Sequence, residues 1–354
     1  MKLPFHPEKL PIKTNVLTKE IINKLVKATE SLAFLNSKIK LTKTDASFLM
    51  IHLASREAVF SNKIEGTNTT MNELYEKIRE EDKNEPIDEV KRYIQALNYI
   101  DQIDKEPVIN TRLLLTLHRF ILGERSRGGN KPSGEYRTGQ VYVGKHIPPE
   151  ANKINEYMYN LENYMNDVID DNLPDLIKCA IIHSHFETIH PFWDGNGRMG
   201  RILIPLYLYK KNKIFEPYFF LSKSLEKDKN MYYTYLQETR DNPEEGYKNW
   251  ISLFLDAITI QTHSDIKLIE AIDNLYAECL RKINKNRIMD QSVLNAIFEN
   301  PVFEIKEIKE LTTSTNYSVR DIVKRLVDSK MIFKDQKQRN SKYYFYKLID
   351  ILSE

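Results

Sequence analysis

Residues 189–201 read IHPFWDGNGRMGR and join two segments that both have helical periodicity. The first helix ends near His190 and Pro191, the chain turns through Asp194 to Gly197, and a second helix follows. The first peptide N–H groups of a helix have no acceptor inside it, and glycine leaves room for an anion to approach them. The stretch therefore predicts an anion-binding turn between two helices.

Two arginines stand at the start of the second helix. Arg198 and Arg201 are three residues apart, so they share one helix face. A cation at a helix N-terminus opposes the helix dipole by about 0.3–1 kcal/mol. The pair therefore favours an anionic ligand such as phosphate, whose oxygens match the guanidinium fork. The alternative is that both are surface arginines that pair with nearby acids.

A histidine and an aspartate flank the turn. His190 can accept a proton from an attacking hydroxyl near neutral pH, and Asp194 offers the carboxylate oxygen that Mg²⁺ prefers. A histidine next to a proline is more often structural when it stands alone. Together with the Gly-Asn-Gly turn and the two arginines, His190 and Asp194 predict a group-transfer site.

Composition limits the class of protein. The chain has 354 residues, enough for two or three domains, and its net charge of +2 gives no global field for nucleic acid or an anionic membrane. Its two cysteines, Cys179 and Cys279, exclude a disulfide framework. No apolar run approaches about 18 residues, and the N-terminus lacks the apolar core of a signal peptide. We expect a soluble, cytoplasmic protein with no membrane partner.

Apolar residues recur at three- and four-residue spacing along most of the chain, which predicts a mainly α fold. The alternating run Val141, Tyr142, Val143 and Gly144, followed by Pro148 and Pro149, predicts a small β-hairpin flap. Helices are expected over 19–38, 44–66, 70–82, 87–104, 110–122, 150–169, 173–190, 197–211, 224–240 and 246–284.

The sequence pattern changes from long helical segments to shorter ones at about residue 287. Three short helical patterns, the basic turn KDQKQRNSK and the β-rich run YYFYKL are typical of a winged helix-turn-helix. We therefore expect an N-terminal helical region over 1–105, a catalytic core over 106–262, a linker helix over 263–286 and a winged-helix domain over 287–354.

The run from His190 to Arg201 resembles the signature of the Fic family, His-x-Phe-x-(Asp/Glu)-Gly-Asn-Gly-Arg-x-x-Arg, at every defined position. The likeness extends over most of the chain. It implies a helical Fic core with a flap. It also implies transfer of AMP from Mg-ATP to Ser, Thr or Tyr hydroxyls of a target protein, including the enzyme itself, with release of pyrophosphate.

The resemblance also implies roles for individual residues. His190 becomes the general base, Asp194 the Mg²⁺ ligand, and Val141, Tyr142, Val143 and Gly144 the flap that clamps the target. Tyr233 would lie against the adenine. The remaining nucleotide-binding residues are Gly195, Asn196, Gly197, Arg198, Met199, Gly200 and Arg201.

Ser61 to Gly66, SNKIEG, resemble the family's inhibitory pattern, (Ser/Thr)-x-x-x-Glu-(Gly/Asn), which carries Ser61, Glu65 and Gly66. Glu65 lies at the negative end of its helix, where a carboxylate is disfavoured, and Arg201 has the opposite problem. We expect a Glu65–Arg201 ion pair that occupies the γ-phosphate site and holds ATP unproductively. The alternative is a solvated acid near a helix end.

Two other functions are left open. The same site could remove AMP from a modified protein, with Glu65 orienting a water molecule. The chain could instead be a nucleotide-sensing regulator whose C-terminal helix contacts DNA through Ser318, Arg320, Lys324 and Arg325, although nearby acids dilute that charge. The target protein, the self-modified hydroxyls and a homodimer are not decided by the sequence.

Overall fold

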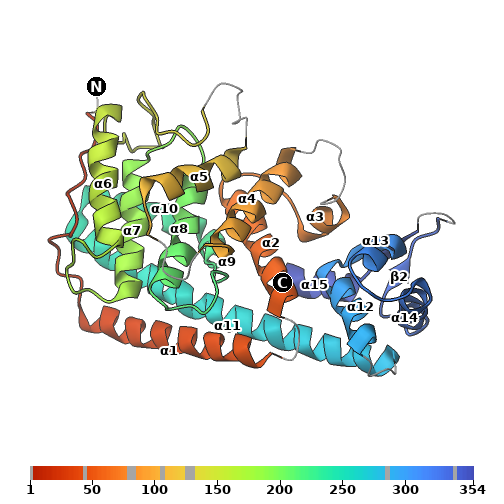
Figure 1. The fold of residues 1–354 in the computed structure, drawn as a ribbon. Coiled ribbons are helices and arrows are strands. Elements are labelled where there is room, and N and C mark those ends of the chain that lie inside the picture. The colour runs from red at the N-terminus through yellow and green to blue at the C-terminus, as the bar shows by residue number, and fades with distance from the viewer. Residues whose placement is uncertain are drawn as a thin grey trace.

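The computed structural model describes residues 3–42, 46–77, 85–103, 108–123, 132–283, 288–337 and 341–354. These residues are mostly helical, as the apolar periodicity predicts (Figure 1). The N-terminal half contains α1 (Lys19–Leu41), α2 (Ala46–Ile64), α3 (Met71–Lys77), α4 (Glu85–Asp101), α5 (Thr111–Leu122), the short 3₁₀ helix η1 (Ala151–Lys153), α6 (Ile154–Met165) and α7 (Asp175–Ile189). The remainder contains α8 (Asn196–Lys210), α9 (Ser222–Lys227), α10 (Lys229–Asp241), α11 (Pro243–Ile283), α12 (Ile288–Glu299), β1 (Val302–Glu304), α13 (Ile305–Glu310), α14 (Asn316–Asp328), β2 (Phe333–Lys334), β3 (Lys342–Tyr344) and α15 (Tyr346–Ser353).

Helices α7 and α8 form the centre of the molecule. Every residue of α7 from Leu176 to Ile189 is buried, and α8 is buried along almost its whole length despite Pro205. A helix that is apolar on all sides must be surrounded by other helices. The turn between α7 and α8 is therefore held by packed elements on both sides.

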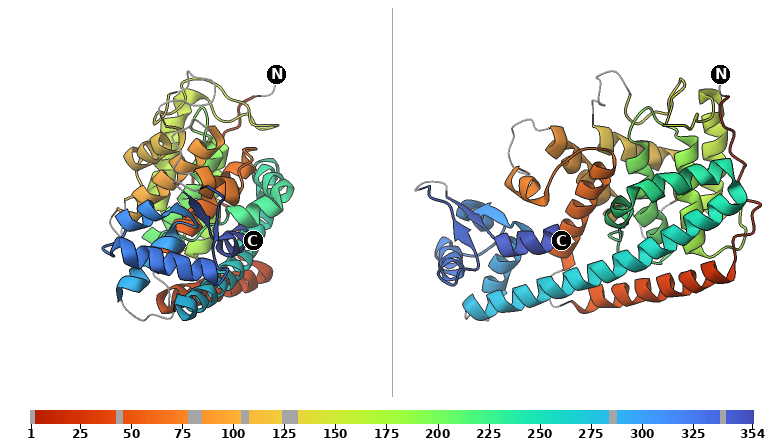
Figure 2. Two further views of the ribbon diagram at one scale, coloured as in Figure 1. Left: turned by 90° about the vertical axis from the view of Figure 1, so that its right-hand side faces the viewer. Right: turned by 180° about the vertical axis from the view of Figure 1, so that it is seen from behind.

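Helix α11 runs the length of the molecule, with α1 alongside it (Figures 1 and 2). The indole N–H of Trp250 on α11 donates to the carbonyl of Ala180 at 2.7 Å, which ties α11 to α7. Since α11 continues unbroken from Pro243 to Ile283, the expected linker helix is the second half of a longer helix. The domain boundaries stay predictions.

Three elements differ from the sequence expectation. In the run YYFYKL, which was expected to be β-rich, only Tyr343 and Tyr344 belong to a strand, and α15 begins at Tyr346. The run 224–240 is divided into α9 and α10 at Asp228, whose backbone leaves the helical region. The flap is reduced to one bridging pair, Val143 and His146, around a tight turn in which Gly144 has a φ of +58°. Pro148 and Pro149 have no N–H to extend a ladder, and the side chain of Gln140 donates to the Pro148 carbonyl instead.

The C-terminal module has the expected three helices, α12 to α14, and a strand pair, β2 and β3. A further strand, β1, completes an antiparallel sheet of order β1-β3-β2. The winged-helix assignment stays a prediction. His52 on α2 joins this module to the rest of the chain, because its Nε2 lies 2.7 Å from the Phe298 carbonyl and its Nδ1 lies 2.6 Å from the Tyr75 hydroxyl. Across the described segments, no helix combines the length and apolarity needed to cross a membrane.

Candidate active site

The turn between α7 and α8 is closed by one side chain. The amide of Asn196 donates from Nδ2 to the Phe192 carbonyl at 2.9 Å, and its Oδ1 accepts from the Phe192 N–H at 2.8 Å. His190 has a left-handed backbone with a φ of +49°, and Gly195 has a φ of +74° directly before α8. The side chain of Asn196 thus shapes the turn, so only its backbone N–H is available to a ligand.

The predicted anion site is the start of α8. The first helical hydrogen bond joins the N–H of Met199 to the Gly195 carbonyl. The backbone N–H groups of Asn196 and Gly197 therefore have no acceptor within the helix. A Cβ on Gly197 would collide with the carboxylate of Glu65. The anion at the N-terminus of α8 is therefore the protein's own Glu65, in a position that the helix dipole favours.

Arg201 holds this carboxylate. Its Nη2 lies 2.7 Å from Oε1 of Glu65 and donates to the Ser61 carbonyl at 3.0 Å, while its Nε donates to the Ser61 hydroxyl at 2.8 Å. Burial lowers the pKa of Arg201, but the Glu65 carboxylate outweighs it and the pKa lies above its ordinary value. The structure therefore contains the predicted ion pair, with Gly66 (φ +91°) ending the turn after α2.

Arg198 is also buried, and acids surround it. Its terminal nitrogens lie 3.9 Å from Glu89 and 3.7 Å from Asp194, and Nη1 donates to the Asn62 side chain at 3.4 Å. The alternative interpretation of the arginines was right that they pair with acids. It was wrong that they lie on the surface, since Arg198 and Arg201 are only 4% and 2% exposed.

Met199 and Gly200, the other two residues of α8 expected to bind nucleotide, have no side chain directed at the turn. The side chain of Met199 is fully buried in the core. Gly200 packs against the Glu187 carboxyl, and a Cβ there would collide with it. Neither residue presents a side chain to the site, so only their backbone can contribute to nucleotide binding.

His190 is neutral in this state. Burial, together with the positive charge of Arg240, lowers its pKa to about 3. Among the described residues, its Nδ1 is sealed from solvent and has no hydrogen-bond partner, although the Glu187 carbonyl lies close enough to raise the pKa slightly. His190 as a whole residue is half-buried.

Arg137 fixes the flap to the backbone around His190. Its guanidinium donates to the carbonyls of His190 at 2.9 Å, Gly139 at 2.8 Å and Pro149 at 2.6 Å. Its own N–H donates to the Pro191 carbonyl. Burial lowers its pKa to about 10. Arg137 was not among the residues predicted from the sequence, and its neighbours in sequence gave no sign of this role.

His118, which the sequence analysis did not single out, supports the turn from α5. Its ring stacks on Phe192 with centroids 3.7 Å apart, and its Nδ1 accepts from the Gly134 N–H at 2.8 Å. The proton is therefore assigned to Nε2, which donates to the Asp194 carbonyl at 3.0 Å. Its position in the middle of an amphipathic helix looks like that of any core residue.

A cavity of about 620 Å³ opens between the flap and α10. Val143, Gly144 and Lys145 of the flap line it, together with Tyr233 and Glu187. Tyr232, the neighbour of Tyr233 in sequence, lies in the core, where its hydroxyl is 2.9 Å from Nε2 of His183. Tyr142 is 72% exposed on the flap.

Asp194 can take part in metal binding only with help from a ligand. Its Oδ1 accepts from the Gly195 N–H at 2.6 Å, and its side chain is 27% exposed. Within the described ranges, no group of three acidic, histidine or cysteine side chains could hold a metal ion. Mg²⁺ commonly uses one or two carboxylates and completes its shell with phosphate oxygens and water, so a lone Asp194 fits such an ion.

Family models and curated relatives match large parts of this chain. Residues 108–208 match the Fic/DOC family, and residues 22–100 match the Fic/DOC family N-terminal region. Protein adenylyltransferase Fic of Drosophila mojavensis is 30% identical over 183 residues, which are 48% of this chain and 36% of that protein. The Drosophila melanogaster protein of the same name is 35% identical over 124 residues, which are 35% of this chain and 24% of that protein. The chain thus spans well under half the length of these curated relatives.

Solved structures share the fold. A Fic family protein from Desulfovibrio desulfuricans G20 aligns over 94% of this chain and 97% of its own, with a TM-score of 0.59 at 19% identity. A Fic domain containing signaling protein from Bacteroides thetaiotaomicron VPI-5482 aligns over 69% of this chain and 97% of its own, with a TM-score of 0.53 at 20% identity. The fold and the turn after His190 define a Fic-type helical protein. The chain belongs to the Fic/DOC family.

Proposed function

We propose that this chain transfers AMP from ATP to hydroxyl side chains of proteins and that Glu65 restrains the reaction. The observation that carries the proposal is the carboxylate of Glu65, which lies at the N-terminus of α8 and 2.7 Å from Arg201. A site that stabilises one carboxylate in this way is suited to phosphate oxygens. The names of the curated relatives support the same activity.

In this proposal the turn binds the phosphates. The N–H groups at the start of α8 cradle the α-phosphate, and Arg198 and Arg201 bind the outer phosphates, Arg201 the γ-phosphate. Asp194 would hold Mg²⁺, which when bound offsets the charge of the leaving pyrophosphate. The adenosine occupies the cavity between the flap and α10, with Tyr233 against the base.

His190 acts as the general base. Burial lowers the pKa of His190, so the ring is unprotonated at neutral pH and its Nε2 is the atom that would take the proton of the attacking hydroxyl. The hydroxyl oxygen forms a bond to the α-phosphorus as the bond to the bridging oxygen breaks, and pyrophosphate leaves. Arg137 and His118 are positioning residues, since they hold the backbone on either side of this ring.

The flap presents the target. Val141 and Tyr142 make no bridge to another strand in the described part of the chain, so their backbone can pair with an extended segment of a target protein. Gly144 provides the tight turn that holds this edge beside the cavity. The target chemistry is a Ser, Thr or Tyr hydroxyl on such a segment, and the enzyme's own hydroxyls are included.

Restraint by Glu65 follows from charge. While Glu65 is paired with Arg201, that arginine is not available to bind the γ-phosphate. The carboxylate and the phosphate are both negatively charged and repel each other. ATP then binds in an orientation that does not aim its α-phosphorus at the hydroxyl. Removal of AMP with Glu65 orienting water is the nearest alternative, and its support is that the Glu65 side chain is still 32% exposed beside the turn.

The experiment compares ATP labelled at the α-phosphate with ATP labelled at the γ-phosphate, using the full chain and the Glu65→Gly variant. AMP transfer predicts that only the α-label stays on protein and that Glu65→Gly increases it. A γ-label on protein would contradict AMP transfer. If Glu65→Gly instead accumulates label because the intact chain removes it, pre-labelled protein will lose label only when Glu65 is present.

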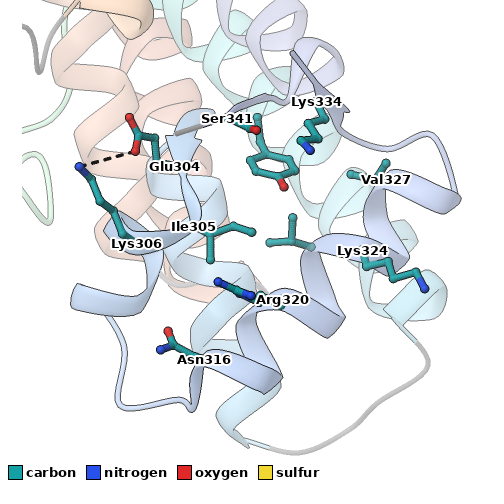
Figure 3. A pocket seen from close by; sticks show the side chains of 11 residues that line it. Glu304, Ile305, Lys306, Asn316, Arg320, Lys324, Val327, Lys334 and Ser341 are labelled. Atoms are coloured by element: carbon teal, nitrogen blue, oxygen red, sulfur yellow. Dashed lines mark ion pairs between the residues drawn. The ribbon is translucent and has the colours of Figure 1, made fainter. Parts of the chain in front are cut away.

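A second function, binding of duplex DNA by the C-terminal module, is favoured by a groove of about 710 Å³ between α14 and the sheet (Figure 3). Arg320 and Lys324 on α14 and Lys334 on β2 line it, and within the described residues none of the three has an ion-pair partner. Lys306 also lines the groove but lies 3.6 Å from Glu304. Three cations without counterions suit a phosphate backbone.

Retention of the full chain on duplex DNA at increasing salt tests this function. Arg320→Ala with Lys324→Ala should weaken retention and reduce its salt dependence. The sequence included Arg325 among the DNA contacts, but in the structure it lies outside the groove lining and pairs with Asp321 at 3.2 Å. Arg325→Ala, on the same helix, is therefore the matched control. Lack of retention at low salt, or binding of an acidic peptide instead, would contradict the DNA function.

A further inference from the structure

Glu187 is a buried carboxyl without a partner. It lies one helical turn before His190 on α7 and is 7% exposed. Its Oε1 is sealed from solvent, and neither carboxyl oxygen makes a hydrogen bond or ion pair within the described residues. A buried acceptor left unsatisfied is destabilising, so such a group calls for an explanation.

The surroundings do not supply a structural reason for the acid. The carboxyl lies against Gly200 and near the edge of His183, on the wall of the 620 Å³ cavity. Burial raises the pKa of Glu187 to about 7, and the charge of Arg201 opposes that rise. An apolar side chain of similar size would fill this position without the desolvation penalty.

Arg240 lines the same cavity and is complementary to Glu187. Its Nε donates to the Thr188 hydroxyl at 3.0 Å and its Nη1 donates to the Gln237 side chain at 3.1 Å. These bonds orient the guanidinium and leave Nη2 for a ligand. The cavity therefore offers a carboxyl acceptor from α7 and a guanidinium donor from α10.

We propose that Glu187 is a specificity-determining residue whose Oε2, the carboxyl oxygen that is not sealed from solvent, accepts a hydrogen bond from the nucleoside in this cavity. The chemistry required is an N–H or O–H donor, which a nucleoside supplies either as the amino group of the base or as a ribose hydroxyl. Arg240 donates to an acceptor on the same nucleoside. This inference rests on the proposed function, which assigns the cavity to the nucleoside.

Ligand analogues that each lack one donor identify the contact. The protein is the full chain with Glu65→Gly and His190→Ala, so that nucleotide can bind but is not consumed. Calorimetry with Mg²⁺ then compares ATP with purine riboside triphosphate, which lacks the amino group, and with 2′-deoxy-ATP and 3′-deoxy-ATP. The same titrations are repeated after Glu187→Met and Glu187→Gln.

Before Glu187 is changed, one analogue should bind about tenfold more weakly than ATP. That penalty should nearly vanish in Glu187→Met, and Glu187→Gln should keep part of it, because the amide oxygen still accepts. A penalty confined to the purine riboside assigns the amino group, and one confined to a deoxy analogue assigns the ribose. Glu244→Met, the same substitution at an exposed position outside the cavity lining, should change no penalty.

The outcomes separate the two claims. If the protein binds ATP and every analogue penalty is the same with and without Glu187, the role of Glu187 is wrong while the proposed function stands. If the protein binds no ATP in the first place, both are wrong. Thermal melting guards against misfolding, because Glu187→Met removes an unsatisfied buried acceptor and should not lower the melting temperature.

Discussion

The carboxylate of Glu65, just after the last turn of α2, lies 2.7 Å from the guanidinium of Arg201, in the first turns of α8. Each charge faces the unfavourable end of its own helix dipole, and each is stabilised by the other. Because Glu65 also rests on Gly197, one side chain engages both the arginine and the helix N-terminus. Competition with phosphate follows from this arrangement.

Glu65→Gly should therefore change nucleotide affinity selectively. With Arg201 released, affinity for Mg-ATP should rise about tenfold, whereas affinity for ADP should change little because ADP has no γ-phosphate. Calorimetric titration of both nucleotides measures this difference. Glu226→Gln is the control. It removes the ion pair between Glu226 and Lys63, which lies in the last turn of α2, and does not affect Arg201. Equal gains for ATP and ADP would show that Arg201 is not the γ-phosphate ligand.

Arg137→Ala should loosen the flap. The substitution leaves the carbonyls of His190, Gly139 and Pro149 without their donor, at a cost of about 3 kcal/mol or more. Limited proteolysis should then cut within the flap, and the free energy of urea unfolding should fall. Arg325→Ala, which removes an exposed arginine, should do neither. An intact flap and unchanged stability would mean that other contacts hold it.

Asn196→Ala should damage the turn while leaving all charges in place. Both hydrogen bonds to Phe192 are lost, which should cost about 1–3 kcal/mol of stability. The N–H groups at the start of α8 would no longer be held in a fixed cradle, so ATP affinity should fall about tenfold in the Glu65→Gly background. Unchanged ATP affinity would argue that the turn keeps its shape without this side chain.

Stability should fall on acidification because of buried histidines. Burial, as the main cause, lowers the pKa of six of the eight histidines far below the ordinary 6.5, to about 3 for His190 and to about 4 for His52, His118, His146, His183 and His185. Below about pH 6.5 these histidines bind protons in the unfolded chain but stay unprotonated in the folded chain. Each such histidine lowers the free energy of unfolding by about 1.4 kcal/mol per pH unit until its folded pKa is reached.

Buried carboxyls act in the opposite direction. Burial raises the pKa of Glu57 and Glu187 to about 7 and that of Asp265 to about 6, so the folded chain holds protons that the unfolded chain releases. The histidines outnumber these acids, and the net effect between about pH 7.5 and about pH 5.5 should be a loss of stability. Urea unfolding at the two pH values measures it. Equal or greater stability at the lower pH would contradict the assigned buried states.

The sequence predicted those parts of the site that lie close together in the chain. Asp194, Gly195, Asn196 and Gly197 are consecutive, and their residue types alone indicate an anion-binding turn. The contact between Glu65 and Arg201 was predictable despite its long separation, because each residue is conspicuous at the wrong end of a helix.

Contacts made by ordinary-looking residues from distant segments could not be predicted. His118 and Arg240 lie in helices where a polar residue attracts no notice, and only the packed fold brings them to the site. Glu187 was hidden in a segment that reads as a buried helix. The extent of the hairpin flap was overestimated. Pro148 and Pro149 were interpreted only as its end, although they lie where the partner strand would need N–H donors.

The central claim is that the turn after His190 binds ATP so that a hydroxyl can attack its α-phosphorus. The most direct measurement is the transfer of label from the α-phosphate of ATP to protein by the Glu65→Gly variant, with and without His190→Ala. We expect strong labelling that His190→Ala abolishes while ATP still binds. Labelling that persists without the His190 imidazole, or ATP binding that leaves Arg201 and the start of α8 untouched, would contradict it.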